Sequence, residues 1–166
     1  MDDPVAMDVI GVRIELPTNT PILLLREREG KRYLPIWIGT NEATAIALAL
    51  EGVEPQRPMT HDLLKLVTEA LGGEVNRVVV TDLRDGTFFA DLILSRDGEE
   101  MSLSSRPSDA IALAARTEAP VFAARSVLDE GGVQIQDENQ EEEIERFREF
   151  LDDVTAEDFG SGPSAS

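Results

Sequence analysis

Polar and charged side chains cluster directly before a run of small apolar residues, in the stretch Ser105-Arg106-Pro107-Ser108-Asp109. Proline lacks the N–H that would be unpaired in a first helical turn, so Pro107 predicts a helix start, with Arg106 or Ser105 as its N-cap. Asp109 then lies in the first turn, where the helix dipole stabilises a carboxylate. Helix N-termini also offer N–H groups to anions, so the stretch is either a structural junction or a binding site.

The single histidine of the chain, His61, is followed by Asp62 and stands four residues after Arg57. A histidine can act as a general base near neutral pH, and an aspartate can orient it or bind a metal ion. Neighbouring residues of a helix point about 100° apart, so His61 and Asp62 cannot form a catalytic dyad with each other. The alternative interpretation is that His61 is a surface or capping residue at the start of a helix.

Carboxylates are expected at the starts of three predicted helices, at Glu42, Asp62 and Asp109. If they converge, their oxygens suit Mg²⁺ or Mn²⁺, and Arg57 or Arg106 could hold a phosphate group. Further acidic candidates are Asp82 and Asp91, on neighbouring predicted strands. The metal hypothesis requires the first three carboxylates to lie together rather than to bond separate partners.

Several well-defined motifs are missing from the sequence: a phosphate-loop glycine pattern, a dinucleotide-binding fingerprint, a Gly-x-Ser-x-Gly elbow and a paired-histidine metal motif. Aromatic residues interleaved with basic ones, typical of platforms for nucleic acid bases, are not found either. The aromatic residues on predicted strands are expected in the core; they are Tyr33, Trp37, Phe88 and Phe89.

The amino-acid composition of the chain excludes several kinds of functional site and partner. The chain has no cysteine, which excludes thiolate nucleophiles, thiolate metal sites and disulfides and fits the reducing cytoplasm, where we expect the protein. No apolar run approaches the roughly 20 residues of a membrane span, so we expect no membrane partner.

Residues 129–166 hold 13 acidic and 2 basic residues, which is −11 of the net charge of −18. Because nucleic acid affinity comes largely from Lys and Arg, this balance argues against tight non-specific binding.

The hydrophobic pattern predicts an α+β fold. Three strands come first, over 5–16, 21–26 and 33–38, with a bulge at Gly11, where the alternation slips. Two later strands, over 75–83 and 87–94, form a hairpin, residues 101–104 lead into the helix that follows Pro107, and 120–124 is a last short strand. We therefore predict a mixed, mostly antiparallel sheet with buried Ala-rich helices packed on it.

The predicted helices differ in character. Residues 41–50 and the run after Pro107 are rich in alanine, which allows close packing on a sheet. Residues 62–71, capped by Thr60, are amphipathic, with one apolar face formed by Leu63, Leu64, Leu66, Val67, Ala70 and Leu71. A turn at 129–132 precedes a C-terminal amphipathic helix, whose apolar residues are Ile144, Phe147, Phe150, Leu151 and Val154. We predict a domain over 1–128, an acidic extension with this helix over 129–154 and a disordered tail over 155–166.

Four stretches resemble the bifunctional nuclease (BFN, or DUF151) domain in order and spacing, over roughly residues 5–128. They are Leu34-Pro35-Ile36-Trp37-Ile38-Gly39 with Glu42-Ala43, Arg57-Pro58-Met59-Thr60-His61-Asp62-Leu63-Leu64, Asp82-Leu83 with Thr87-Phe88-Phe89-Ala90, and Ser105-Arg106-Pro107-Ser108-Asp109-Ala110-Ile111-Ala112. The resemblance implies a small α+β phosphodiesterase, since plant members are described as acting on DNA and RNA. It nominates as site residues Glu42, Arg57, His61, Asp62, Arg106, Ser108 and Asp109. Ser104 departs from the pattern, because many relatives carry an acid there.

Two hypotheses follow. The first is a weak, metal-assisted nuclease that acts on DNA and RNA, in which His61 or Asp62 takes a proton and Arg57 or Arg106 stabilises the developing charge. The second is a non-enzymatic oligomeric binding or regulatory module, with 57–62 and 105–109 as a structural junction or ligand groove. A nuclease needs two of the carboxylates within about 4–6 Å in an open cleft, whereas a junction shows them capping helices or paired with arginines. Under either hypothesis we expect a homo-oligomer, with a dimer favoured.

Overall fold

The computed structural model describes residues 3–134. Contacts between residues divide the chain into two units, 1–133 and 134–166, so the following account concerns the first unit. The predicted C-terminal amphipathic helix and the tail over 155–166 lie outside the described residues. Among the described residues, no helix is long and apolar enough to cross a membrane.

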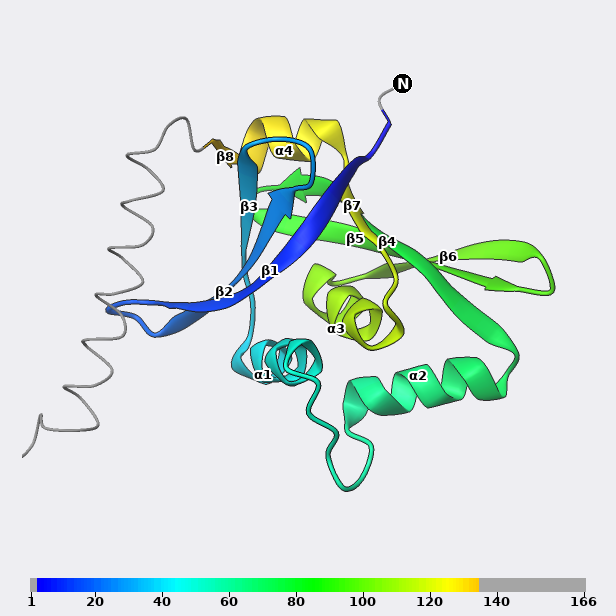
Figure 1. Cartoon of the computed structure of the whole chain (residues 1–166). Coiled ribbons are helices and arrows are strands. Elements are labelled where there is room, and N and C mark those ends of the chain that lie inside the picture. Colours follow the sequence, from blue (N-terminus) through cyan, green and yellow to red (C-terminus); the bar gives the residue numbers. More distant parts are fainter. Residues whose placement is uncertain (1–2, 135–166) are drawn as a thin grey trace, which may run out of the picture. The chain divides into compact units, whose positions relative to one another are not determined.

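One eight-stranded sheet forms the frame of the described part of the chain, in the order β6-β5-β4-β7-β1-β2-β3-β8 (Figure 1). The strands are β1 (Val5–Glu15), β2 (Thr20–Glu27), β3 (Arg32–Trp37), β4 (Gly73–Arg84), β5 (Thr87–Arg96), β6 (Glu99–Ser105), β7 (Val121–Ala123) and β8 (Val133–Gln134). Strands β1, β2 and β3 pair antiparallel, as do β4, β5 and β6. The short β7 joins these halves, since it runs antiparallel to β1 and parallel to β4. The predicted mixed, mostly antiparallel sheet is confirmed.

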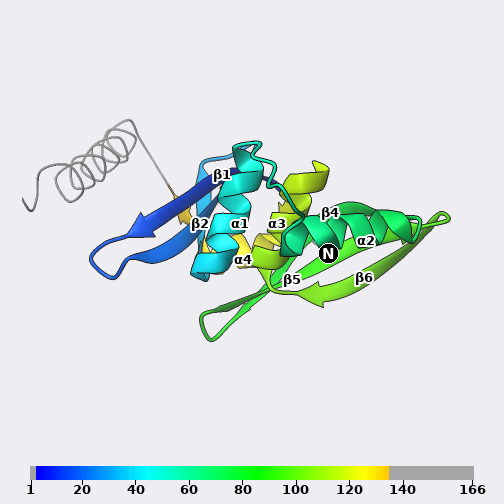
Figure 2. The same cartoon turned by 90° about the horizontal axis from the view of Figure 1, so that it is seen from below.

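Four helices accompany the sheet in the described residues: α1 (Thr40–Leu50), α2 (Thr60–Ala70), α3 (Pro107–Thr117) and α4 (Arg125–Gly131). Helix α3 lies between α1 and α2 and contacts both (Figures 1 and 2). Residues Ala110–Ala114 of α3 are all buried, as are Ala43, Ala45 and Ile46 of α1. Small side chains let α3 approach the sheet and its neighbours closely, so the α+β fold with buried Ala-rich helices is as predicted.

Two local predictions are confirmed by the backbone. Helix α3 begins at Pro107 with Arg106 as its N-cap. The pairing of β1 with β2 shifts register between Val9 and Gly11, and Gly11 has φ +148°, a conformation that residues with side chains rarely adopt. Both features are dictated by neighbours in the chain, which is why the sequence predicts them.

Other expectations need correction. Residues 101–104 do not merely lead into α3, because they belong to β6, which pairs with β5 along its length and lies at one edge of the sheet. Residue 128 and the start of the turn predicted at 129–132 lie inside α4, whose Val127 and Leu128 are buried. Helix α2 begins at Thr60, with Met59 rather than Thr60 at the N-cap.

The apolar side chains of α2 are not buried in the described part of the chain. Leu63, Leu64, Leu66 and Val67 are 43–54% exposed, and Leu71 is 65% exposed. His61 is the buried residue of this helix. Helix α2 packs beside α3 and β4 rather than over the centre of the sheet, so its amphipathic pattern leaves an apolar surface.

Candidate functional site

Polar side chains from the first turns of three helices meet around α3. Glu42 lies in the first turn of α1, His61 and Asp62 in that of α2, and Asp109 in that of α3, which Arg106 caps. The packing of α3 between α1 and α2 brings these turns together, although the residues are far apart in the chain. The group divides into two sets of contacts, one around Arg106 and one around Asp62.

His61 bonds Asp109 across the interface between α2 and α3. Its Nε2 lies 3.0 Å from Asp109 Oδ1, and its side chain is only 8% exposed. The alternative interpretation of His61 as a surface or capping residue is therefore wrong. This contact, with His61 Nε2 as the donor to the carboxylate, keeps Asp109 oriented.

Arg106 connects Asp109 to Glu42. Its Nε and Nη2 lie 2.8 Å from Asp109 Oδ2, and its Nη2 lies 3.3 Å from Glu42 Oε2. We call His61, Asp109, Arg106 and Glu42 the Arg106 network. Its accessible members are Arg106, with a side chain 64% exposed, and Asp109, at 30%. The bonds of Arg106 within the described residues engage Nε and Nη2, so Nη1 remains to meet an anion.

The electrostatics of the network favour charged side chains. Burial acts to raise the pKa of Asp109, but hydrogen bonds from Arg106 and His61 outweigh it and the pKa is lowered. The hydrogen bond to Asp109 raises the pKa of Arg106. Asp109 is therefore a carboxylate at neutral pH and an acceptor of hydrogen bonds.

A glycine holds Glu42 in place. Gly39 is the N-cap of α1, and a Cβ atom added there would collide with Oε1 of Glu42. The Glu42 carboxylate thus folds back against the bare Cα atom of Gly39, within reach of Arg106. Gly39 had no predicted role beyond its place in a motif, and its position three residues before an acid in a first turn was the available signal.

Asp62 belongs to a separate set of contacts. Its Oδ2 accepts the backbone N–H of Met59 at 2.9 Å, and its Oδ1 accepts Nε of Arg116 at 2.6 Å. The hydrogen bond from Met59, followed by the effects of Arg116, lowers the pKa of Asp62 despite its burial. Arg116 also donates to the carbonyl of Ala112 at 2.7 Å. Asp62 therefore caps α2 and ties it to α3, and sequence reasoning missed its partner Arg116.

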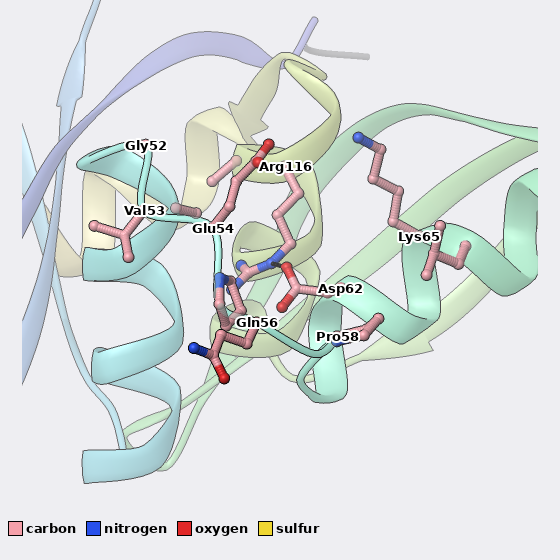
Figure 3. A pocket seen from close by; sticks show the side chains of 12 residues that line it. Gly52, Val53, Glu54, Gln56, Pro58, Asp62, Lys65 and Arg116 are labelled. Carbon is pink, nitrogen blue, oxygen red and sulfur yellow. Dashed lines mark hydrogen bonds and ion pairs between the residues drawn. The ribbon is translucent and has the colours of Figure 1, made fainter.

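A pocket of about 470 Å³ opens beside this ion pair, between the α1–α2 loop and the ends of α2 and α3. Figure 3 shows Asp62 and Arg116 facing each other, with Glu54, Gln56 and Lys65 around them. Arg116 is bonded to Asp62 and to a carbonyl, so its donors serve the packing of the helices. We therefore propose no reaction or ligand for this pocket.

The predicted convergence of Glu42, Asp62 and Asp109 is not found. No group of three or more His, Cys, Asp or Glu side chains within residues 3–134 is arranged to hold a metal ion. Glu42 and Asp109 share Arg106, whereas Asp62 bonds Arg116. A guanidinium group therefore occupies the place between carboxylates where the hypothesis put a cation.

The remaining candidates are dispersed. Arg57 is exposed in the α1–α2 loop, and no ion pair joins it to another described residue. Asp82 pairs with Arg84 at 2.6 Å near the end of β4, and Asp91 lies on β5 opposite Val79. Ser108 is buried in α3 and lines a hollow that also contains Arg106. Trp37 lines the same hollow and is 56% exposed, so the expectation that it is a core residue is wrong.

Comparison with known proteins shows that the chain is similar to the bifunctional nuclease domain. The family model of the bifunctional nuclease domain matches residues 23–136, which includes every residue of the Arg106 network. An uncharacterized protein of Mycobacterium tuberculosis, Rv1829, is 49% identical over 159 residues, covering 91% of this chain and 95% of the relative.

Plant relatives are more distant. Bifunctional nuclease 2 of Arabidopsis thaliana is 30% identical over 74% of this chain, and bifunctional nuclease 1 of Oryza sativa subsp. indica is 28% identical over 76%. The matched segment spans 39% of the length of each plant protein. The match of the family model over more than half of the sequence confirms the resemblance seen in the motifs: the chain belongs to the bifunctional nuclease domain family.

Proposed function

We propose that this protein hydrolyses phosphodiester bonds of DNA and RNA at the Arg106 network. The proposal is carried by the ion pair between the exposed Arg106 and the half-buried Asp109. The other carboxylate oxygen of Asp109 is bonded by the buried His61. A guanidinium group next to a fixed carboxylate can bind a phosphate and accept a proton from an attacking water molecule. Family membership and the plant relatives named bifunctional nucleases support the same chemistry.

In the proposed reaction, Nη1 of Arg106 binds a non-bridging phosphate oxygen and stabilises the charge that develops there. Water attacks phosphorus, and its proton passes to the carboxylate of Asp109. The bond between phosphorus and the departing sugar oxygen breaks, and this oxygen takes a proton from solvent. His61 is a positioning residue, since it acts through Asp109, and Glu42 holds the other side of Arg106.

Asp62 and Arg57 have no part in this step. Asp62 is engaged by Met59 and Arg116, and Arg57 lies exposed in the loop before α2. The described residues do not form a ligand set for Mg²⁺ or Mn²⁺, so the proposed reaction uses only water and the side chains of this chain. Assays with Mg²⁺, Mn²⁺ or EDTA measure whether the activity depends on these ions.

The experiment measures cleavage of single-stranded DNA and RNA by wild type, Asp109→Asn and His61→Ala, each with Mg²⁺, Mn²⁺ or EDTA. Asp82→Asn is the matched control, because Asp82 also pairs with an arginine but lies outside the network. We expect Asp109→Asn to lose about 100-fold or more in kcat, as removal of a general base does, while Asp82→Asn keeps wild-type activity. His61→Ala should lower kcat more than it changes KM. Equal activity in all four proteins, or none in the wild type under every condition, would overturn the proposal.

A second candidate is the binding module without catalysis. It is favoured by the observation that Glu42, Asp62 and Asp109 all bond arginines, as expected of a structural junction. Under this candidate, Asp109→Asn alters the unfolding midpoint while the wild type cleaves no substrate. The same protein preparations therefore distinguish the two functions.

We also propose that the protein forms a homodimer. The exposed apolar face of α2 supports this, and so does the edge strand β6, whose Met101 and Leu103 are exposed in the described part of the chain. Exposed strand edges and apolar patches are the surfaces that a second copy covers.

A further inference from the structure

A hollow of about 330 Å³ lies next to the Arg106 network and is built from three segments. The end of β3 and the entry to α1 contribute residues 36–39, the β4–β5 turn contributes 86–88, and the start of α3 contributes 106–108. Arg106 belongs both to the hollow and to the network, so whatever fills the hollow lies beside the proposed phosphate site.

Trp37 is the unusual feature of this hollow. In β3 the buried residues are Leu34 and Ile36, and strand alternation places Trp37 on the opposite side, with 56% of its surface exposed. A scattered exposed apolar residue needs no explanation. Trp37 differs because it borders a hollow that is also lined by Arg106 and by the largely buried Ser108.

These groups match the chemistry of a nucleobase. Unpaired bases stack on indole rings and on guanidinium planes, and their edges seek hydrogen-bonding groups. Ser108 provides a hydroxyl, and Gly86 leaves backbone without a side chain, since a Cβ atom there would meet nothing within 4 Å. The net charge of −18 repels the phosphates of a strand, but base stacking itself does not depend on a basic surface.

We propose that the hollow is a base-stacking subsite, in which Trp37 holds an unpaired base of single-stranded DNA or RNA while the adjacent phosphate lies on Arg106. This subsite rests on the proposed function, because it uses the same arginine. Bases inside a duplex are stacked on each other, so the subsite selects single strands. The sequence pattern does not reveal this combination, because Trp37 and Arg106 are distant in the chain and line the same hollow only in the fold.

Binding is tested in EDTA at equilibrium, with a short labelled oligonucleotide followed by fluorescence anisotropy. The probes are the single strand, its duplex and an abasic strand of the same length, which keeps the phosphates but lacks bases. Trp37 is the only tryptophan of the chain, so quenching of its fluorescence by the unlabelled single strand is a direct second readout. We expect quenching and binding with the single strand, and weak binding with the other two probes.

The variants are Trp37→Ala and Trp37→Phe, with Leu103→Ala as the control, an exposed apolar residue of the edge strand β6. Trp37→Ala should weaken single-strand binding by about 5- to 150-fold, the usual effect of losing one stacked base, while Trp37→Phe retains most of the affinity. Circular dichroism verifies that each variant is folded. Wild-type affinity in Trp37→Ala, or equal binding of abasic and normal strands, would overturn the subsite.

The outcomes for the subsite and for the proposed function are separable. Base-dependent binding that Trp37→Ala abolishes, together with no cleavage by the wild type, keeps the subsite and rejects hydrolysis. Cleavage that Asp109→Asn abolishes but Trp37→Ala leaves unchanged in both kcat and KM keeps hydrolysis and rejects the subsite.

Discussion

Among single residues, the two adjacent side chains of His61 and Asp62 have different partners and different structural roles. His61 is buried against Asp109, while Asp62 caps α2 and bonds Arg116. The divergence follows from helix geometry, because neighbouring side chains point about 100° apart. One residue therefore supports the Arg106 network and the other holds two helices together.

The contribution of Asp62 to stability should depend on acid pH. Its pKa in the folded protein is lowered from the ordinary 3.8, so its stabilising effect is complete above that value and is lost as pH falls through the folded pKa. We expect Asp62→Asn to cost about 1–3 kcal/mol of unfolding free energy near pH 7, the range for a hydrogen bond to a charged group. The difference from wild type should shrink well below pH 3.8.

Urea unfolding followed by circular dichroism at both pH values measures this difference. Asp97→Asn is the control, since Asp97 is an exposed turn residue with φ +52°, which asparagine also tolerates. It should change stability little at either pH. A cost of Asp62→Asn that stays the same from neutral to acid pH would show that the Arg116 pair does not stabilise the fold.

At the scale of elements, α2 is the helix whose sequence pattern and packing disagree. Its apolar side chains recur with helical spacing, yet they remain about half exposed in residues 3–134 because the helix packs beside α3 and β4. By contrast, α3 uses small residues to enter the space between α1 and α2. The exposed face of α2 is therefore the surface that we propose for contact between copies of the chain.

A charged double variant of this face, Leu63→Lys with Val67→Lys, should remain folded and shift the homodimer to monomer. The two residues are four apart, on one side of the helix, and each is about half exposed. Light scattering coupled to size exclusion measures the mass. Val53→Lys, at an equally exposed residue of the α1–α2 loop, should leave the dimer intact. A monomeric wild type, or a double variant that stays dimeric, would contradict this assignment.

At the scale of the whole molecule, the acidic composition distinguishes this protein from nucleic-acid binders that depend on a basic surface. A net charge of −18 repels a polyanion, so under the proposed function nucleic acid would be recognised by a few directed contacts, such as Arg106 and a stacked base. This arrangement suits short single-stranded segments better than long duplexes.

Salt should therefore affect cleavage only weakly. With one phosphate neutralised, a single-strand binder has a slope of log affinity against log salt of about −0.7, so a sixfold rise in salt lowers kcat/KM by about fourfold at most. The measurement is kcat/KM for a single-stranded oligonucleotide between about 50 and 300 mM NaCl. A loss of 100-fold or more would reveal several additional phosphate contacts and contradict recognition by few contacts.

Local sequence patterns predict the α+β class, the bulge at Gly11, the start of α3 at Pro107 and the family of the chain. Each of these depends on alternation, capping or motif order, which are properties of residues near one another in the chain. The tertiary structure decided the rest. The pairs His61–Asp109, Asp62–Arg116 and Glu42–Arg106 join residues 48, 54 and 64 apart in the sequence.

Such pairings exist only because α3 packs between two other helices, and no local pattern specifies which side chains then meet. The burial of His61 and the exposure of Trp37 have the same origin, since a residue's surroundings are set by elements distant in sequence.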